Sequence, residues 1–447
     1  MALSGLEIYK KLPKTNCGDC AVPTCMAFAM KLAAGQAELS ACPHVSPEAA
    51  EALGAASAPP VRPISVGAGP AVFKIGGETV LFRHEKTFIN PPGVAVLVTD
   101  AMSEGEVDSR LKAISSLQYD RVGLKLKANL AAVKSNDAGK LTALAQKAAG
   151  SGAAVMLMSG SADALKAAAA SIKDQKPLLY AATKANADAM GALAKEMGLP
   201  LVVKGEGSLE SVVALTEKLA GMGLKDLLID TGTRGIKKAL EEQVQIRRLA
   251  IKKTFRPLGY PTVVFPAEMT KDPVTEALYA SIFVAKYGGI IVMSDLRGET
   301  LFPLLVARMN IYTDPQRPMA TQKGIYPINN PTENSPVLVT SNFSLTYFIV
   351  SGELESSRLP AWLIVVDTEG LSVLTSWAAG KFAADIVGPY VLKCGIIDKI
   401  KHKKLIIPGV VASISGELEE EMPGWEIMIG PREAVHIANY LKERFAA

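Results

Sequence analysis

The chain has 447 residues, of which 49% are hydrophobic and 21% are charged. This length exceeds what one typical core organises and predicts about two to four domains. The net charge is only +4, which gives no case for binding nucleic acid or an anionic membrane. Residues 1–14 lack the apolar run of a signal peptide, and no uncharged stretch approaches the roughly 18 apolar residues that span a bilayer. We therefore expect a cytoplasmic protein.

Four of the five cysteines lie close together near the N-terminus. Three of them follow one another at short spacing, and the fourth follows after sixteen intervening residues and is itself followed by proline. Soft thiolates suit iron–sulfur centres, and such clusters typically take four cysteines. We predict a [4Fe–4S] cluster ligated by Cys17, Cys20, Cys25 and Cys42.

Two other interpretations of these cysteines remain open. Structural zinc also takes four cysteines, usually as two short-spaced pairs, whereas the grouping here is three plus one. Disulfides belong mainly to secreted chains. The segment holds little core of its own, so we expect the cluster to stabilise a small domain over residues 1–58, which ends at the proline-rich stretch after it.

Residues 59–320 alternate short apolar runs with amphipathic helical patterns, which predicts a central (β/α)₈ barrel. The predicted strands are Val94–Asp100, Arg121–Leu126, Ala153–Ser159, Pro177–Thr183, Pro200–Lys204, Asp226–Asp230, Pro261–Pro266 and Gly289–Asp295. The predicted helices are Glu106–Leu117, Ala138–Ala149, Ala162–Lys173, Asn186–Met197, Leu209–Met222, Ile236–Thr254, Pro273–Tyr287 and Glu299–Asn310.

Polar residues end six of these strands and are catalytic candidates by the barrel rule. They are Asp100, Ser159, Thr183, Lys204, Asp230 and Asp295. The favoured interpretation is that they cap the helices that follow. No histidine lies in the predicted strands, which weakens the hypothesis of a barrel enzyme with a catalytic rim.

A second linker is predicted over Pro315–Pro336, which is rich in proline. The alternation of strand and helix then restarts and predicts a Rossmann-like α/β domain over residues 321–447. Its predicted strands are Val337–Thr340, Trp362–Asp367, Leu405–Pro408 and Glu426–Ile429, and its predicted helices are Phe343–Val350, Leu371–Ala384 and Arg432–Phe445.

Three loops of this last domain follow predicted strands: Thr340–Ser344, Asp367–Ser372 and Ile429–Glu433. Open α/β sheets bind ligands at the carboxyl ends of their strands, so the three loops together predict a ligand site. Helix capping explains any one of them equally well. The chain has neither a Gly-x-Gly-x-x-Gly motif nor a P-loop, so dinucleotide and P-loop nucleotide sites are not indicated.

These motifs resemble a known family. Leu6–Pro13 followed by Cys-x₂-Cys-x₄-Cys-x₁₆-Cys-Pro is similar to the cluster domain of corrinoid iron–sulfur protein large subunits. Thr340–Tyr347, Asp367–Thr375 and the stretch from Gly424 to Ala434 are similar to the C-terminal domain of that family. The similarity covers essentially the whole chain in the same three-part order.

The resemblance implies a methyl carrier of the reductive acetyl-CoA pathway. The cobalt of a corrinoid (a cobamide) would accept the methyl group of methyltetrahydrofolate through a methyltransferase and donate it to acetyl-CoA synthase. The cluster would relay electrons that return Co(II) to Co(I). The implied partners are a small barrel subunit in a heterodimer, that methyltransferase, acetyl-CoA synthase, and a reductive activator or ferredoxin.

The resemblance also implies cofactor-binding positions, while it assigns no catalytic residue. The corrinoid would contact Thr340, Ser341, Asn342, Phe343, Thr346, Gly370, Leu371, Ser372, Val373, Thr375, Gly430, Pro431 and Ala434.

Many corrinoid proteins supply a cobalt-ligating histidine from Asp-x-His-x-x-Gly. None of His44, His84, His402 and His436 lies in that motif, and His402 is predicted to lie on the solvated surface. We therefore expect a cobalt without a protein imidazole, which makes reduction to Co(I) easier. The alternative function is an iron–sulfur electron-transfer subunit of a flavin-containing redox complex.

Overall fold

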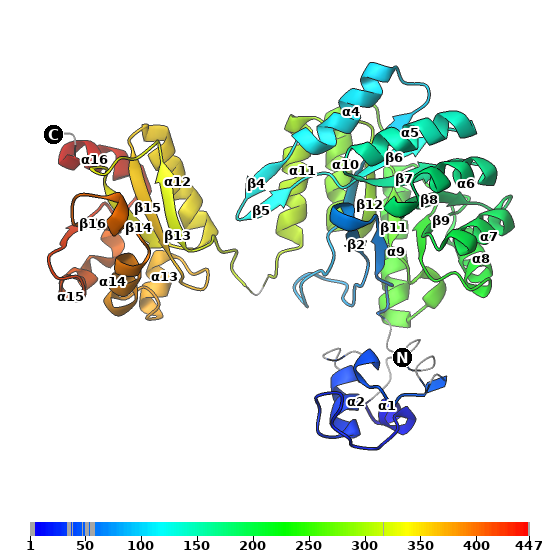
Figure 1. Ribbon diagram of the computed structural model, residues 1–447, viewed down its shortest axis with the longest axis horizontal. Coiled ribbons are helices and arrows are strands. Elements are labelled where there is room, and N and C mark those ends of the chain that lie inside the picture. Colours follow the sequence, from blue (N-terminus) through cyan, green and yellow to red (C-terminus); the bar gives the residue numbers. More distant parts are fainter. Residues whose placement is uncertain are drawn as a thin grey trace. The chain divides into compact units, whose positions relative to one another are not determined.

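The computed structural model describes residues 5–33, 37, 39–46, 48–49, 53, 59–315 and 317–445. Two compact units are present (Figure 1). The first unit runs to Tyr119 and from Leu126 to Tyr312, and the second comprises Asp120–Lys125 and the chain from Thr313 onwards. The predicted end of the cluster domain, at residue 58, lies outside the described residues.

The N-terminal segment has a small core of its own. It contains α1 (Gly5–Lys11), α2 (Cys25–Ala33) and the 3₁₀ turn η1 (Leu39–Ala41). Apolar side chains such as Ile8 and Phe28 pack there together with Cys25 and Cys42. Two of the four clustered cysteines therefore belong to this core.

The central barrel is closed and parallel, as predicted, in the strand order β10-β11-β12-β3-β6-β7-β8-β9. Its strands are β3 (Gly93–Thr99), β6 (Leu130–Lys134), β7 (Ala154–Met158), β8 (Leu178–Ala182), β9 (Leu201–Lys204), β10 (Leu227–Asp230), β11 (Thr262–Val264) and β12 (Gly288–Met293). Its helices are α4 (Glu104–Ser116), α5 (Ala138–Gly150), α6 (Ala162–Ser171), α7 (Ala187–Met197), α8 (Leu209–Gly221), α9 (Ile236–Lys253), α10 (Pro273–Ala285) and α11 (Gly298–Ile311).

One predicted barrel strand, Arg121–Leu126, was wrong. These residues belong to a two-stranded hairpin of β4 (Tyr119–Arg121) and β5 (Leu124–Leu126). Val122 and Gly123 between them both have positive φ, 53° and 73°, which is the requirement of a type I′ hairpin turn. The second barrel strand is instead β6, whose first four residues are fully buried.

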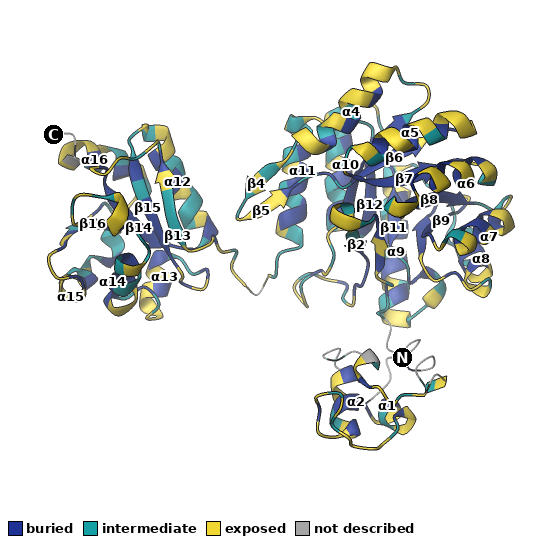
Figure 2. Cartoon of the chain, viewed as in Figure 1, coloured by how far each residue is buried: buried dark blue, intermediate teal, exposed yellow. Residues whose placement is uncertain are grey.

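The barrel interior is filled by side chains from its strands and from a short strand pair, β1 (Ile64–Val66) and β2 (Phe73–Ile75). Figure 2 shows buried strands enclosed by helices whose outer faces are exposed. Short 3₁₀ turns complete this unit at η2 (Gly69–Ala71), η3 (Lys173–Gln175), η4 (Arg256–Leu258) and η5 (Pro266–Glu268).

The C-terminal unit is a five-stranded sheet in the order β13-β15-β14-β16-β17. Its strands are β13 (Gly324–Ile328), β14 (Val337–Ser341), β15 (Ala361–Val366), β16 (Lys404–Ile407) and β17 (Glu426–Ile429). Its helices are α12 (Ser344–Ser357), α13 (Val373–Ala378), α14 (Ala384–Lys393), α15 (Ser415–Glu421) and α16 (Ile437–Phe445), with 3₁₀ turns η6 (Ile397–Lys399), η7 (Gly409–Ile414) and η8 (Ala434–His436).

Part of the predicted linker Pro315–Pro336 forms a strand, β13, so the prediction was wrong for those residues. This strand pairs antiparallel with β15 at the sheet edge, and its Pro327 is tolerated because edge strands need fewer backbone donors. The other strands are parallel, with one hydrophobic core on each face of the sheet. This is the Rossmann-like α/β arrangement that was predicted.

The direction of winding reverses between β14 and β16. The chain passes from β14 through α12 to β15 on one side, and later returns to β16 on the other side of β14. Such a switch point is where open α/β sheets bind ligands. Among the described residues, no helix is both long and apolar enough to cross a membrane.

Candidate functional site

The cysteine loop is organised around Asn16 and Cys25. The side-chain Oδ1 of Asn16 accepts a hydrogen bond from the backbone N–H of Cys25 at 2.8 Å, and the backbone N–H of Asn16 donates to Cys25 Sγ at 3.4 Å. Cys25 is also the first residue of α2, whose N-terminus favours a thiolate. Hydrogen bonds of this kind to sulfur tune iron–sulfur centres.

The four predicted ligands differ in exposure, and all of them are free thiols. Cys17 is exposed, Cys20 is intermediate, and Cys25 and Cys42 are buried. Cys17 and Cys20 lie on the loop before α2, Cys25 begins α2, and Cys42 directly follows η1. Four soft sulfur donors fit the donor set of an iron–sulfur cluster.

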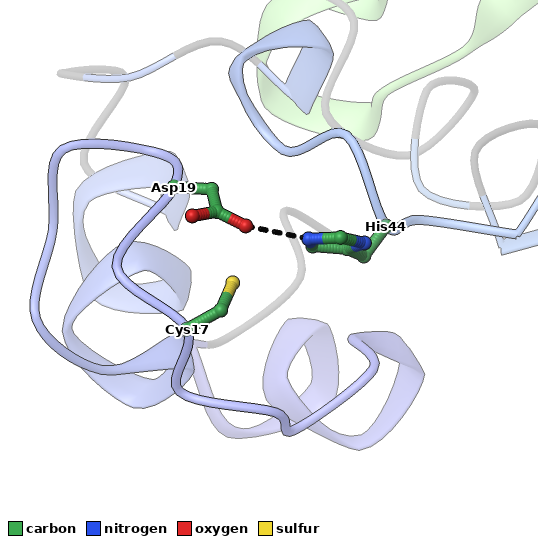
Figure 3. Close-up of side chains that lie close together, drawn as sticks. All are labelled: Cys17, Asp19 and His44. Atoms are coloured by element: carbon green, nitrogen blue, oxygen red, sulfur yellow. Dashed lines mark hydrogen bonds and ion pairs between the residues drawn. The ribbon is translucent and has the colours of Figure 1, made fainter.

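Next to Cys17 lie a carboxylate and an imidazole (Figure 3). His44 Nε2 is 2.6 Å from Asp19 Oδ2. The hydrogen bond from His44, followed by one from Cys17, holds the pKa of the Asp19 carboxyl below its ordinary value. The ligand atoms of Cys17, Asp19 and His44 lie within 4.8 Å of one another. Ligation by the four thiols stays a prediction.

A cavity of about 290 Å³ opens at the switch point of the C-terminal sheet. Its wall comes from the carboxyl ends of β14, β16 and β17 and from the starts of α12, α13 and α16. The lining residues are Leu338, Val339, Thr340, Thr346, Ile349, Val350, Ser372, Val373, Leu374, Ile406, Ile407, Pro408, Val410, Gly430, Pro431, Arg432, Glu433, Ala434 and Ile437. Most of these side chains are apolar, with a few hydroxyl and charged groups at the rim.

Thr340 carries a polar group that points to a ligand. It lines the cavity and is only 1% exposed, and its Oγ1 has no hydrogen-bond partner in the described part of the chain. A buried hydroxyl without a partner is costly in a folded protein. A ligand with a polar edge, such as the amides of a corrin ring, fits this position.

Asn342 holds two of the predicted loops together. Its Oδ1 accepts hydrogen bonds from the backbone N–H groups of Thr368 and Gly370, at 3.0 and 2.9 Å, and lies 2.8 Å from the Thr368 hydroxyl. Its Nδ2 donates to Asp367 Oδ1 at 3.0 Å. The amide therefore fixes the loop after β14 against the loop after β15.

Comparison with known proteins gives full-length matches. The family model described as CO dehydrogenase/acetyl-CoA synthase delta subunit matches residues 63–441, and an Fe-S cluster model matches residues 12–44. The corrinoid/iron-sulfur protein large subunit of Moorella thermoacetica is 45% identical over 100% of both chains. The acetyl-CoA decarbonylase/synthase complex subunit gamma of Methanopyrus kandleri is 37% identical over 99% of this chain and 98% of its own.

The chain belongs to the corrinoid/iron–sulfur protein large-subunit family. The resemblance inferred from the motifs is thereby confirmed at the level of the family. The matches do not test the individual cofactor-binding positions, which stay predictions.

The structure brings some of the family's predicted corrinoid contacts together and leaves others out of the cavity wall. Those that line it are Thr340, Thr346, Ser372, Val373, Gly430, Pro431 and Ala434. Those in the same loops that do not line it are Ser341, Asn342, Phe343, Gly370, Leu371 and Thr375. Several of the second group have structural contacts instead, such as the 2.9 Å contact between the hydroxyls of Thr375 and Ser372.

Sequence reasoning missed the wall formed by the end of β16. Ile406, Ile407 and Pro408 lie across the switch point from β14. Their strand was predicted, so the strand-end rule could have included them. They were overlooked because the prediction relied on hydroxyl-rich and glycine-rich loops, and this segment is apolar.

No histidine lines the cavity among the residues that the structure describes. His402 is not a solvated surface residue, so that prediction was wrong. Its ring is partly buried, with Nε2 3.0 Å from Ser335 O and Nδ1 accepting from the backbone N–H of Lys404 at 3.2 Å. The two lysines beside it in sequence suggested exposure, but the His402 ring contacts the backbone of Ser335 and Lys404.

The interpretation of the barrel-strand ends as helix caps was also wrong. The side-chain caps of α4, α6 and α8 are Ser103, Ser161 and Ser208, a few residues past the strand ends. Because loop residues separate each strand end from its helix, the residue directly before the helix provides the cap instead. Three of the strand-end residues, Ser159, Thr183 and Lys204, instead line a cavity at the mouth of the barrel.

Proposed function

We propose that the chain is a methyl carrier that holds a corrinoid in the cavity of its C-terminal unit and an iron–sulfur cluster at its four N-terminal cysteines. The observation that carries this proposal is the cavity at the β14–β16 switch point, with the unpartnered hydroxyl of Thr340 in its wall. Full-length relatives named as corrinoid/iron–sulfur protein support it.

A bound corrinoid supplies a cobalt that takes up and releases a methyl group. The chain's own contribution is to bind and shield it. Thr340 would hydrogen-bond a polar edge of the ring, and buried apolar walls such as Val339 and Ile406 would exclude water. Asn342 acts as a positioning residue because it fixes the loops without lining the cavity. Since no described histidine lines the cavity, the chain offers no imidazole to the metal there.

A bound cluster at Cys17, Cys20, Cys25 and Cys42 supplies an electron for reductive reactivation. The exposed side of Cys17 gives an electron donor access to the cluster loop, while the buried Cys25 and Cys42 anchor the loop in its core. The reducing cytoplasm is the compartment in which four free thiols of this kind persist.

We also propose the partners. Exposed apolar side chains lie on α12, α13 and η8, the elements that contribute to the cavity wall, namely Leu345, Ile349, Leu374, Trp377 and Val435. Exposed apolar patches mark interaction surfaces. The fitting occupants are a small barrel subunit in a heterodimer and, in turn, a methyltetrahydrofolate methyltransferase, acetyl-CoA synthase and a reductive activator or ferredoxin. Several relatives are named as subunits of an acetyl-CoA decarbonylase/synthase complex.

The test is transfer of a labelled methyl group. The full chain, purified anaerobically with its small subunit, is incubated with the methyltransferase and methyltetrahydrofolate carrying a radioactive methyl group. We expect label on the wild-type protein and on Thr321→Val, and less label and less retained corrinoid on Thr340→Val. Thr321 is the matched control because its hydroxyl is also buried and unpartnered but lies outside the cavity wall. A flavin in place of the corrinoid, with no transfer, would favour the electron-transfer alternative.

A further inference from the structure

The mouth of the barrel gathers charged residues that the proposed methyl carrier does not use. In the strand register Lys134 pairs with Met158, and Met158 pairs with Tyr180. Lys204 pairs with Asp230 at the end of the neighbouring strands. These residues therefore lie at the carboxyl ends of consecutive strands, where barrels of this kind bind their ligands.

Three charged side chains at this mouth, Asp230, Arg234 and Glu268, form ion pairs with one another. Asp230, only 2% exposed, accepts two hydrogen bonds from Arg234, at 2.8 and 3.0 Å, and one from the Tyr180 hydroxyl at 2.7 Å. Arg234 also contacts Glu268 and lies 4.6 Å over the ring of Phe265. Arg234 and the two carboxylates thus satisfy one another.

Two lysines beside this group lack such pairing. The nearest carboxylate oxygen to Lys134 Nζ is on Glu268 at 3.9 Å. Lys204 has no ion pair with any described residue, and its Nζ lies 6.0 Å from the centre of the Tyr180 ring. Among the residues that line the cavity beside them, these two lysines face one carboxylate, that of Glu268, which leaves one excess positive charge in the lining.

The two lysines line one cavity of about 160 Å³, and the side-chain amide of Asn136 lines it as well. Asn136 Oδ1 accepts hydrogen bonds from the backbone N–H of Gly160 at 3.1 Å and the hydroxyl of Ser159 at 3.3 Å. These bonds fix the orientation of the amide, and its Nδ2 has no partner among the described residues. The polar lining of the cavity thus includes two ammonium groups and an amide donor, together with the Glu268 carboxylate, which Arg234 also contacts.

We propose that the barrel mouth binds a small molecule through a carboxylate or phosphate group, with Lys204, Lys134 and Asn136 as its donors. This site is separate from the corrinoid cavity and does not depend on the proposed function. Carboxylates and phosphates accept the charge-assisted hydrogen bonds that ammonium groups donate. The paired group of Asp230, Arg234 and Glu268 forms the rigid edge of the site.

Isothermal titration calorimetry of the full chain tests this, with inorganic phosphate and acetate as the two probes at constant ionic strength. We expect one of them to bind at millimolar concentration, and the tighter one identifies the anionic group. Lys204→Gln should weaken that binding by about tenfold, the usual effect of losing a charge-assisted hydrogen bond. Lys184→Gln, a matched change at an exposed lysine outside the cavity, should leave it unchanged.

Asn136→Asp keeps the oxygen that holds the loop and puts a carboxylate in place of the donor, so it should abolish binding without unfolding the barrel. Circular dichroism of each variant checks the fold. The proposal is overturned if neither anion binds the wild-type chain, or if Lys204→Gln and Lys184→Gln weaken binding equally.

Discussion

Replacing Asn342 with alanine should destabilise the C-terminal unit more than its single side chain suggests. The amide makes hydrogen bonds to two backbone N–H groups, one hydroxyl and one carboxylate, and both Asn342 and Thr368 are buried. With a net contribution of about 0.5–1.5 kcal/mol for each bond, and buried donors left unpaired, we expect a loss of about 3 kcal/mol. At an m-value of about 2 kcal/mol/M, the urea midpoint should fall by about 1.5 M.

Tryptophan fluorescence gives a selective assay for this unit. All three tryptophans of the chain, Trp362, Trp377 and Trp425, lie in the C-terminal unit, so their emission reports its unfolding alone. Urea titration of the corrinoid-free chain removes the contribution of the ligand. The matched control is Ser341→Ala at the adjacent buried position, because the Ser341 hydroxyl has no hydrogen-bond partner within the described chain. It should shift the midpoint little; equal shifts for the two variants would refute the assigned role of Asn342.

Three further predictions concern other parts of the chain. Urea titration should show that Gly370→Ala destabilises the C-terminal unit more than Gly380→Ala does. Both glycines have positive φ, but only a Cβ at Gly370 would meet a backbone oxygen, at 2.9 Å. Equal losses of stability in the two variants would contradict the clash. Cys20→Ser should lower the iron content of the anaerobically purified chain, whereas Cys394→Ser should keep it, and full iron in Cys20→Ser would remove Cys20 from the ligand set. Burial raises the pKa of the Glu276 carboxyl above its ordinary value of 4.5, so the folded chain binds that proton more tightly than the unfolded chain does. The stability that this one group contributes should therefore fall as the pH rises from 4.5 through the folded pKa. Glu276→Gln should flatten that fall in denaturation curves followed by circular dichroism, and an unchanged slope would count against it.

Much of the fold was predictable because the barrel strands are continuous apolar runs bounded by turn residues. The error at Arg121–Leu126 arose because two short strands around a tight turn read as one apolar run. The true strand, Leu130–Lys134, contains two alanines and has no strong strand propensity, so only its burial in the closed barrel defines it. The edge strand β13 was hidden by Pro327, which is acceptable only where tertiary pairing leaves its nitrogen unpaired.

The candidate site was predictable to the extent that local motifs carry it. The hydroxyl-bearing loop residues Thr340 and Ser372 were found because they follow predicted strands. Asn342 was predicted to contact the corrinoid. In the structure it joins two loops instead, through hydrogen bonds to a segment 26 residues further along the chain, which no local pattern reveals. The apolar wall at Ile406 and Ile407 was missed although its strand was predicted, because apolar residues at a strand end carry no local sign of a ligand; only the strand order places them across the switch point from β14.

The most direct test of the account is metal analysis, with a visible spectrum, of the full chain purified anaerobically together with its small subunit. We predict cobalt with the absorption of a corrinoid, and about four iron atoms per chain for a four-cysteine cluster. Zinc at the four thiolates, or a flavin spectrum without cobalt, would contradict it.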